Sequence, residues 1–317
     1  MLPLQAACAL SAAAQPAANP EIAAAKSWAF PSNPASSAAP APPDDKILLH
    51  LPGSAQAFTQ VQIGNLFVAP DWWPQDHPPM PQIVARGRDP AWACAYCHLP
   101  GGQGRPENAA LAGLPADYIV EQVLTLRSGA RTSGSAEMAK FMPVEARNVT
   151  DADLRLSAEY FSQLRFKPWT RIVESASVPK TCFAHFMLVP IRGASSEPID
   201  HRIIEIAQKL ERTERRDERS GFIAYVPPGS IARGKRLATA VGGKTQACIA
   251  CHGADLRGVG NIPPLAGRSP TYLVRQLIQF QDGSRGGPAA APMQQVAATL
   301  ALDDMIAVAA YAASRKP

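Results

Sequence analysis

The 317-residue chain lacks long apolar runs and has few cysteines. No stretch approaches the run of about 18 to 20 apolar residues that a membrane-spanning helix needs, so the sequence predicts no membrane span. Four of the six cysteines stand in two short motifs, and only Cys8 and Cys182 remain. The sequence therefore implies no disulfide framework.

Two copies of a Cys-x-x-Cys-His motif stand 154 positions apart. They are Cys94–His98 and Cys248–His252, and each places two thiols and an imidazole within about one helical turn. This spacing lets both sulfurs add to the vinyl groups of one haem while the His coordinates its iron. A redox pair of the thioredoxin type needs no adjacent His, and a zinc site would need a fourth ligand. The motifs predict two covalently attached haem c groups, with attachment residues Cys94, Cys97, Cys248 and Cys251 and iron ligands His98 and His252.

The surroundings of the motifs repeat as well, which indicates an internal duplication. At the same offset of 154, Leu111–Gly113 matches Leu265–Gly267. Further matched pairs at this offset are Tyr118 with Tyr272, Gln122 with Gln276, Gly129 with Gly283, and Arg131 with Arg285. At an offset of 151, Met142 matches Met293, Asp153 matches Asp304 and Tyr160 matches Tyr311. Such length changes are expected in loops.

Each repeat is expected to be small and helical, because neither shows the alternation of a strand. Opening helices are predicted over 81–88 and 230–240, before the motifs. Amphipathic helices are predicted over 117–126 and 271–281, ended by glycines that favour a left-handed cap. After a Met-bearing loop, a last helix is predicted to start near residue 150 or 302, where Asp side chains can cap it.

This organisation resembles class I cytochrome c domains in tandem, as in the periplasmic di-haem cytochromes of the c4 type. The resemblance covers residues 81–166 and 230–315. It rests on the combination of the Cys-x-x-Cys-His site, the Leu-Ala-Gly loop, the Tyr helix, the Met loop and a last helix that carries Tyr. It implies a mainly α fold of two tandem class I cytochrome c domains, joined by a long irregular or β-containing connector.

The resemblance also implies two packing details. In the family, a small residue of the opening helix packs against an aromatic residue of the last helix. The matching pairs are Gly87 with Tyr160 and Gly234 with Tyr311. The family also has a proline whose carbonyl orients the ligating His. Pro263 stands there in the second repeat and Ala109 in the first, so the carbonyl survives but the rigidity does not.

The sixth iron ligand decides the chemistry, and methionine is the candidate in both repeats. A thioether is a soft, neutral ligand that raises the reduction potential, and an iron with both axial sites filled cannot bind oxygen or peroxide. Met293 and Met142 stand in the same register after their motifs and are the predicted ligands. Met138 remains the alternative for the first haem, because the preceding loop is three residues longer than in the second repeat.

Other candidate ligands outside the motifs are expected to have structural roles rather than to bind metal. His77 lies in an aromatic and proline-rich segment and is expected in a surface loop or packed at a haem edge. Cys182 and His185 lie in what reads as a buried apolar stretch. Their spacing suits metal binding, but nothing nearby in the sequence completes such a site.

The chain is predicted to divide into six segments. Residues 1–14 read as a signal peptide, residues 15–45 as a disordered Pro/Ala linker, and residues 46–80 as an ordered, aromatic-rich lead-in. Residues 81–166 and 230–317 are the two predicted cytochrome c domains. Residues 167–229 form a connector insert, in which 202–206 and 222–226 have strand composition and 211–219 reads as a solvated charged run.

Charge is distributed unevenly between the repeats. Residues 46–167 contain eleven basic and eleven acidic residues, whereas 222–317 contain ten basic and four acidic ones. Such a basic surface steers docking to an acidic redox partner or serves only solubility. Arg257, Arg268 and Arg285 are candidate docking charges, with Arg285 alternatively pairing with a haem propionate. Nucleic acid is not an expected partner of an exported haem protein.

Three functions remain open from the sequence. The favoured one is a periplasmic electron carrier between a dehydrogenase and a terminal oxidase or another cytochrome, with no substrate turnover of its own. The second is a haem enzyme, which needs an open or differently ligated iron. The third is the cytochrome subunit of a dehydrogenase complex, docked through the lead-in and the insert.

Overall fold

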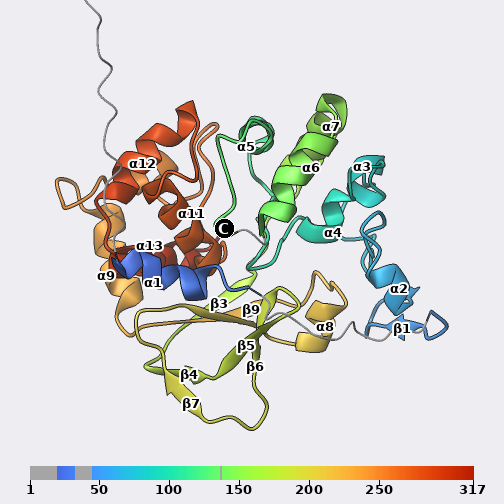
Figure 1. The fold of residues 1–317 in the computed structure, drawn as a ribbon, viewed down its shortest axis with the longest axis horizontal. Helices are drawn as coiled ribbons and strands as arrows, with labels where there is room; N and C mark the ends of the chain where they lie inside the picture. The colour runs from blue at the N-terminus through green and yellow to red at the C-terminus, as the bar shows by residue number, and fades with distance from the viewer. Residues whose placement is uncertain (1–19, 33–44, 136–137) are drawn as a thin grey trace, which may run out of the picture.

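The computed structural model describes residues 20–32, 45–135 and 138–317. Two groups of helices lie side by side, and a β-sheet lies across the same end of both groups (Figure 1). The predicted signal peptide, residues 1–14, lies outside the described residues.

The first group of helices, called the first unit, surrounds the first Cys-x-x-Cys-His motif. It consists of α3 (Gln82–Ala85), α4 (Cys94–His98), α5 (Ala116–Arg127), η1 (Met138–Lys140), α6 (Met142–Asn148) and α7 (Asp151–Gln163). The helix expected over 117–126 is α5, and Gly129 beyond its end has the expected left-handed φ of 78°. The expected Met-bearing loop is instead largely helical, as η1 and α6. Thr150, rather than an Asp, caps α7 by accepting a hydrogen bond from the Asp153 amide at 3.1 Å.

The second group, called the second unit, repeats this order around the second motif. It consists of α9 (Ser230–Thr239), α10 (Ile249–His252), α11 (Pro270–Gln281), η2 (Pro288–Ala290), α12 (Ala291–Ala298) and α13 (Leu302–Ser314). Ser269 caps α11 by accepting from the Tyr272 amide at 3.1 Å, and Pro270 occupies the first helical position. Helix α13 is buried along most of its length, so it forms the centre of this unit.

The two units differ where the opening helix meets the last helix. In the second unit Gly234 packs directly on Ala307 and Tyr311, so the predicted Gly234–Tyr311 contact is confirmed. In the first unit the predicted pairing of Gly87 with Tyr160 is wrong. Helix α3 ends at Ala85, and Gly87 has a φ of 60° in a tight turn. Its Cα faces the backbone of residues 91–93, where an added Cβ would lie 2.6 Å from the Ala91 carbonyl oxygen.

The insert between the units is a β-domain, larger than the two strands expected from composition. Its elements are β3 (Thr170–Glu174), β4 (Ser177–Pro179), β5 (Thr181–Ala184), β6 (Met187–Pro190), β7 (Ser196–Pro198), β8 (Ile204–Ala207), α8 (Leu210–Glu214) and β9 (Phe222–Val226). Five strands form one sheet in the order β3-β9-β8-β6-β5, and β4 pairs with β7. Strands β8 and β9 lie at the two predicted strand segments. Because of this sheet, the description of the chain as a mainly α fold is not confirmed.

Strand β9 connects the cores of both units. Its alternating side chains Phe222, Ala224 and Val226 are buried. Phe222 belongs to the core cluster of the first unit, whereas Ala224 and Val226 belong to that of the second. The side chains between them, Ile223 and Tyr225, pack against the insert's own small core. Because side chains alternate between the two faces of a strand, both faces of β9 are covered by protein.

The lead-in before the first unit is ordered, as expected. It contains β1 (Leu49–His50), β2 (Ala57–Phe58) and α2 (Gln60–Ile63). Trp72 and Trp73 are buried in its core cluster. Their indole N–H groups donate to the Arg215 carbonyl at 2.7 Å and to Asp217 Oδ1 at 2.8 Å. The lead-in is thereby docked on the insert next to α8.

The segment predicted as a disordered linker, residues 15–45, contains a helix, α1 (Pro20–Ala29). Its buried residues Ile22, Ala25 and Ala29 pack in the core cluster of the second unit, where Figure 1 shows the helix against α11 and α13. The prediction of disorder was wrong here, because the alanine-rich sequence favours a helix once its apolar face finds a partner. Residues 33–44 lie outside the described part.

No single helix among the described residues has the length and hydropathy of a membrane span. The adjacent pair Pro288–Ala298 and Leu302–Ser314 passes the same test only together, with a bend of 114° between its helices.

Candidate functional site

Each Cys-x-x-Cys-His motif lies on a short helix of its unit, α4 or α10. In the first motif, α4, Ala95 and His98 are buried, and Leu99 ends the helix with a left-handed φ of 66°. In the second motif, α10, His252 is buried and Gly253 ends the helix with a φ of 82°. The turn after each His directs the chain into the loop that passes behind the imidazole.

Both motif histidines are held by a backbone carbonyl. His98 Nδ1 lies 2.8 Å from the Ala109 carbonyl oxygen, and His252 Nδ1 lies 2.9 Å from the Pro263 carbonyl oxygen. A carbonyl only accepts, so Nδ1 carries the proton and Nε2 keeps the lone pair that a metal ligand needs. Burial lowers the pKa of both imidazoles, which favours the neutral, ligating form. The predicted carbonyl support is confirmed in both repeats, with Ala109 in place of proline.

Three of the four motif cysteines are not activated thiols. Burial raises the pKa of Cys94 to about 12 and also raises the pKa of Cys97 and Cys248. A catalytic dithiol of the thioredoxin type needs the opposite, a lowered pKa that favours the thiolate. All described cysteines are free of disulfide bonds. Two free thiols followed by a neutral imidazole fit the attachment of haem c, with both sulfurs in thioether bonds and the His on the iron.

The candidate sixth ligands lie in the helices that follow. Met293, in α12, packs against Phe280, Ala290 and Ala297. Met142 is the first residue of α6, directly after Phe141, whose ring lies 6.4 Å from that of Trp92 and 5.4 Å from that of Phe186. Met138 lies in the preceding η1 turn and is also partly buried. Both methionines therefore remain candidates for the first haem.

The matched residues of α5 and α11 meet at the boundary between the units. Arg131 donates to Gln122 Oε1 at 2.8 Å and to Gln276 Oε1 at 2.9 Å. Arg285 donates to the same two amide oxygens at 2.8 and 3.0 Å, and to the Tyr118 hydroxyl at 2.6 Å. Arg131 and Arg285 also form an antiparallel backbone bridge. The duplicated residues thus bind each other across an approximate two-fold axis.

This interface contains positive charge without an acidic partner. No ion pair of the described residues involves Arg131 or Arg285. Burial and the neighbouring Arg285 guanidinium lower the pKa of Arg131. The two adjacent guanidinium groups, of Arg285 (buried) and Arg131 (partly buried), suit carboxylate groups such as haem propionates, which would supply the missing negative charge.

The expected docking charges need correction. Arg268 and Arg285 are only 5% and 6% exposed, so neither can reach a partner protein. Arg257 is exposed on the loop after the second motif. Lys235 and Arg236 of α9 and the C-terminal Arg315 and Lys316 are exposed as well. Of these exposed basic residues, the sequence singled out only Arg257. Arg233 and Lys244 are exposed too, but both form ion pairs with Asp304.

The insert contacts the first motif, which sequence reasoning missed. The Arg216 guanidinium lies 3.5 Å from the centre of the Tyr96 ring and donates to the Tyr96 carbonyl at 2.7 Å. Glu218 accepts a hydrogen bond from the Gly101 amide. Residues 211–219 were expected to be solvated, but Asp217 and Glu218 are buried. A signal was present in Trp72 and Trp73, whose buried N–H groups need acceptors.

The remaining candidate ligands, His77, Cys182 and His185, do not form a metal site with other described residues. His77 is buried and bonds the Pro78 carbonyl at 2.9 Å and Asp71 at 3.2 Å, and its ring lies edge-on to Tyr160 at 6.4 Å. Cys182 and His185 are exposed on the insert, so the expectation of a buried apolar stretch was wrong. The described residues contain no group of three or more His, Cys, Asp and Glu side chains that could hold a metal ion.

The chain is similar to known cytochromes. The family model for cytochrome c matches residues 231–316. The "Thiosulfate dehydrogenase electron acceptor" of Thiomonas intermedia is 30% identical over 232 residues, which cover 71% of this chain and 79% of the relative. Cytochrome c4 of Azotobacter vinelandii is 25% identical over 237 residues, covering 72% and 87%. The solved thiosulfate dehydrogenase of Marichromatium purpuratum is 27% identical with a TM-score of 0.47, covering 72% of this chain and 38% of that chain.

Proposed function

Because this chain belongs to the di-haem cytochromes c of the cytochrome c4 type, with two covalently attached haem c groups, we propose that it carries single electrons between redox proteins in the periplasm. Bound haem supplies the one-electron chemistry, and the protein sets its ligation, burial and docking. The donor is a dehydrogenase, and the acceptor is a terminal oxidase or another cytochrome.

The observation that carries the proposal is the pair of equivalent imidazoles. His98 and His252 both have Nδ1 fixed on a carbonyl, so both Nε2 atoms are free to hold iron in the same way. Met293 and either Met142 or Met138 are the proposed sixth ligands. Two six-coordinate haems leave no position for a substrate, which favours a carrier over an enzyme.

The exposed position of Cys182 and His185 also favours the carrier. These side chains were the candidates for unusual ligation in a haem enzyme. Both are exposed on the insert, and Cys182 lies on β5, the edge strand of the five-stranded sheet.

The donor is proposed to be a thiosulfate dehydrogenase, because a relative of this chain is named as the electron acceptor of such an enzyme. The docking surface consists of the exposed basic residues of the second unit that form no ion pair among the described residues: Lys235, Arg236, Arg257, Arg315 and Lys316. These charges would bind an acidic face of the donor and bring the second haem close to it.

Haem stoichiometry tests the cofactor assignment of each motif. A pyridine haemochrome assay of the wild-type protein is expected to find two haems per chain, which stay bound during acid-acetone extraction. Changing Cys248 and Cys251 to Ala is expected to remove one haem and leave the other. Wild-type protein with one haem, or a double variant that still binds two, would contradict the proposed sites.

Salt dependence of electron transfer tests the docking surface. Reduction by a thiosulfate dehydrogenase is expected to slow steeply as salt rises from about 10 mM to about 200 mM, because the screening length falls from roughly 30 Å to roughly 7 Å. Arg257→Glu together with Lys235→Glu is expected to lower the association rate on the order of tenfold at low salt.

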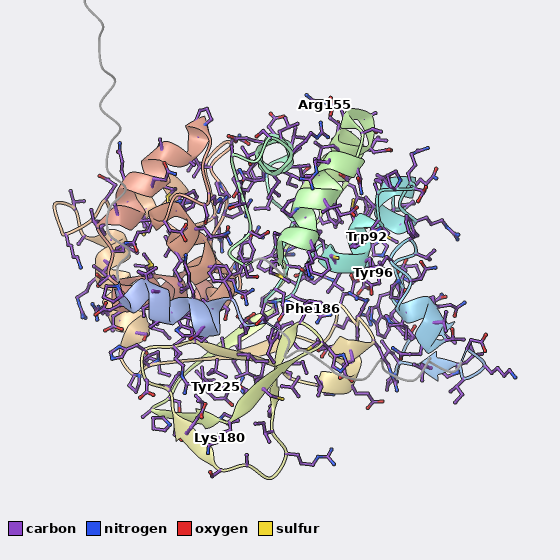
Figure 2. The ribbon with its side chains drawn as sticks, viewed as in Figure 1. Trp92, Tyr96, Arg155, Lys180, Phe186 and Tyr225 are labelled. Carbon is purple, nitrogen blue, oxygen red and sulfur yellow. The ribbon has the colours of Figure 1, made fainter. Side chains whose placement is uncertain are left out.

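Lys180→Glu is the matched control for that experiment. Lys180 is exposed at the far end of the insert, away from the helical units (Figure 2). The control reverses one charge where the double variant reverses two, and it should leave the association rate close to that of the wild type. A loss in the control of about half that of the double variant, on a logarithmic scale, would show that only net charge matters, and a rate independent of salt would refute electrostatic docking.

A further inference from the structure

Arg268 is a buried arginine that joins backbone segments of both units. It follows the Leu-Ala-Gly loop of the second unit and is 5% exposed. Its Nε donates to the Pro264 carbonyl at 2.8 Å within its own unit. Its two terminal nitrogens donate to the Ala110 carbonyl at 2.6 Å and to the Ala112 carbonyl at 3.0 Å in the first unit. One planar guanidinium thus satisfies three carbonyls from two loops.

These acceptors adjoin the carbonyls that hold the motif histidines. Ala110 follows Ala109, the acceptor of His98 Nδ1, and Pro264 follows Pro263, the acceptor of His252 Nδ1. The same loops are fixed from their amide side. The amides of residues 111 and 112 donate to the Gly102 carbonyl, and those of residues 265 and 266 donate to the Leu256 carbonyl. Arg268 restrains carbonyl groups of the same two loops, which these amide hydrogen bonds do not involve.

Arg268 is not part of the duplication. The residue at the matching position of the first unit is Leu114, which is buried and apolar. A single arginine therefore serves both loops from one side of the boundary. The first unit also lacks the proline, because Ala109 stands where the second unit has Pro263. Hydrogen bonds from Arg268 to Ala110 and Ala112 restrict that loop where no proline ring does.

The guanidinium is also an uncompensated positive charge. No ion pair of the described residues involves Arg268, and its nearest ring partner is Phe166, at 4.7 Å from the ring centre. Burial lowers the pKa of Arg268 to about 10, so the side chain is still charged at neutral pH. A buried positive charge between the two loops disfavours the additional positive charge of ferric iron on either side.

We propose that Arg268 is a positioning residue shared by the two haem sites: it holds the backbone that carries the hydrogen-bond acceptors of His98 and His252, and it raises both reduction potentials together. This proposal rests on the proposed role of the two histidines as iron ligands. It assigns to one residue of the second unit an effect on the ligation of the first haem.

The test uses the loaded protein without any partner. Both haem potentials are measured by spectroelectrochemical titration, and exchange of the two histidine Nδ1 protons with solvent is followed by NMR. Arg268→Leu is expected to lower both potentials and to accelerate both exchange rates by about tenfold, since the acceptor loops lose their restraint. Arg268→Lys keeps the positive charge but loses the planar guanidinium that donates to three carbonyls. Proton exchange should therefore accelerate, while both potentials should fall less than in Arg268→Leu.

Arg275→Lys is the matched control. Arg275 is also buried and also bridges the units, donating to the Pro106 carbonyl at 2.9 Å and to the Ala29 carbonyl. Neither acceptor adjoins a histidine partner. This variant should cost stability without changing either Nδ1 exchange rate or either potential.

Three outcomes would overturn the proposal. They are wild-type potentials and exchange in Arg268→Leu, an effect on one haem alone, and equal acceleration of exchange in Arg268→Lys and Arg275→Lys. If Arg268→Leu does not fold, the comparison of Nδ1 proton exchange in Arg268→Lys and Arg275→Lys still tests the proposal. A wild-type protein without two low-spin haems would refute the proposed function instead, and that result is known before any variant is compared.

Discussion

The crossing of α9 and α13 depends on the absence of a side chain at Gly234. An added Cβ would overlap the Ala307 carbonyl and lie 2.8 Å from Tyr311 Cβ. The Ala307 carbonyl belongs to the backbone of a buried helix and cannot rotate away. Helix α13 would have to retreat by roughly 1 Å or more, and a gap of that size forfeits on the order of half of each contact energy.

Gly234→Ala is therefore expected to lower the free energy of unfolding of the protein by about 3 kcal/mol, the upper end for overpacked cores. Because strand β9 completes the cores of both units, they are expected to unfold together, and for a unit of that size the midpoint of thermal unfolding should fall on the order of 6 to 12 °C. The transition can be followed by the near-infrared band of the Met-to-iron bond, which reports the integrity of the haem site.

Gly243→Ala is the matched control in the same unit. A Cβ there would meet Ala240 Cβ at 3.8 Å, an ordinary contact. Its melting temperature should equal or slightly exceed that of the wild type, since alanine restricts the unfolded chain. If Gly234→Ala melted within a few degrees of Gly243→Ala, the close helix crossing would not exist as described.

Two further predictions concern ligation and pH. Met293→His should lower the potential of the second haem in a redox titration, because imidazole supports ferric iron better than a thioether does. Met142→His should lower the potential of the first haem, and Met138→His should change neither potential. If Met138→His instead lowered the potential of the first haem and Met142→His did not, Met138 would be the ligand. Burial raises the pKa of Glu218 to about 7 from 4.5, although the nearby His77 charge opposes this shift, so the native state favours the protonated carboxyl. That contribution to stability is complete below about pH 4.5 and is lost as the pH rises through about 7. Glu218→Gln should remove this loss in melting curves between about pH 5 and pH 8, and an unchanged pH slope would contradict the assignment.

Local signals in the sequence were sufficient for the ends of α5 and α11. Gly129 and Gly283 mark those ends through a backbone preference that holds in any context. The carbonyls of Ala109 and Pro263 followed from the resemblance to class I cytochromes c, and the change to alanine did not matter because a backbone acceptor does not depend on its side chain. Such features survive in any fold that contains the motif.

Features that depend on distant partners could not be read from the sequence. Arg268 and Arg285 look like surface charges until carbonyl and amide oxygens from the first unit, more than a hundred positions away, are placed beside them. Gly87 matched Gly234 by sequence, but its helix ends two residues earlier, so the same residue type serves a turn. The α1 helix was missed because alanine-rich composition does not reveal whether an apolar face will find a partner.

Strand β9 has a consequence for how the molecule loses its structure. Tandem domains on a flexible hinge melt one after the other, each with its own midpoint. Here Phe222 completes one helical core, and Ala224 and Val226 complete the other on the same five-residue strand. Neither core can be kept whole once that strand is released, so the two haem units form one cooperative thermodynamic unit. Contacts of the haem at either end then stabilise the opposite end as well, because both ends unfold together.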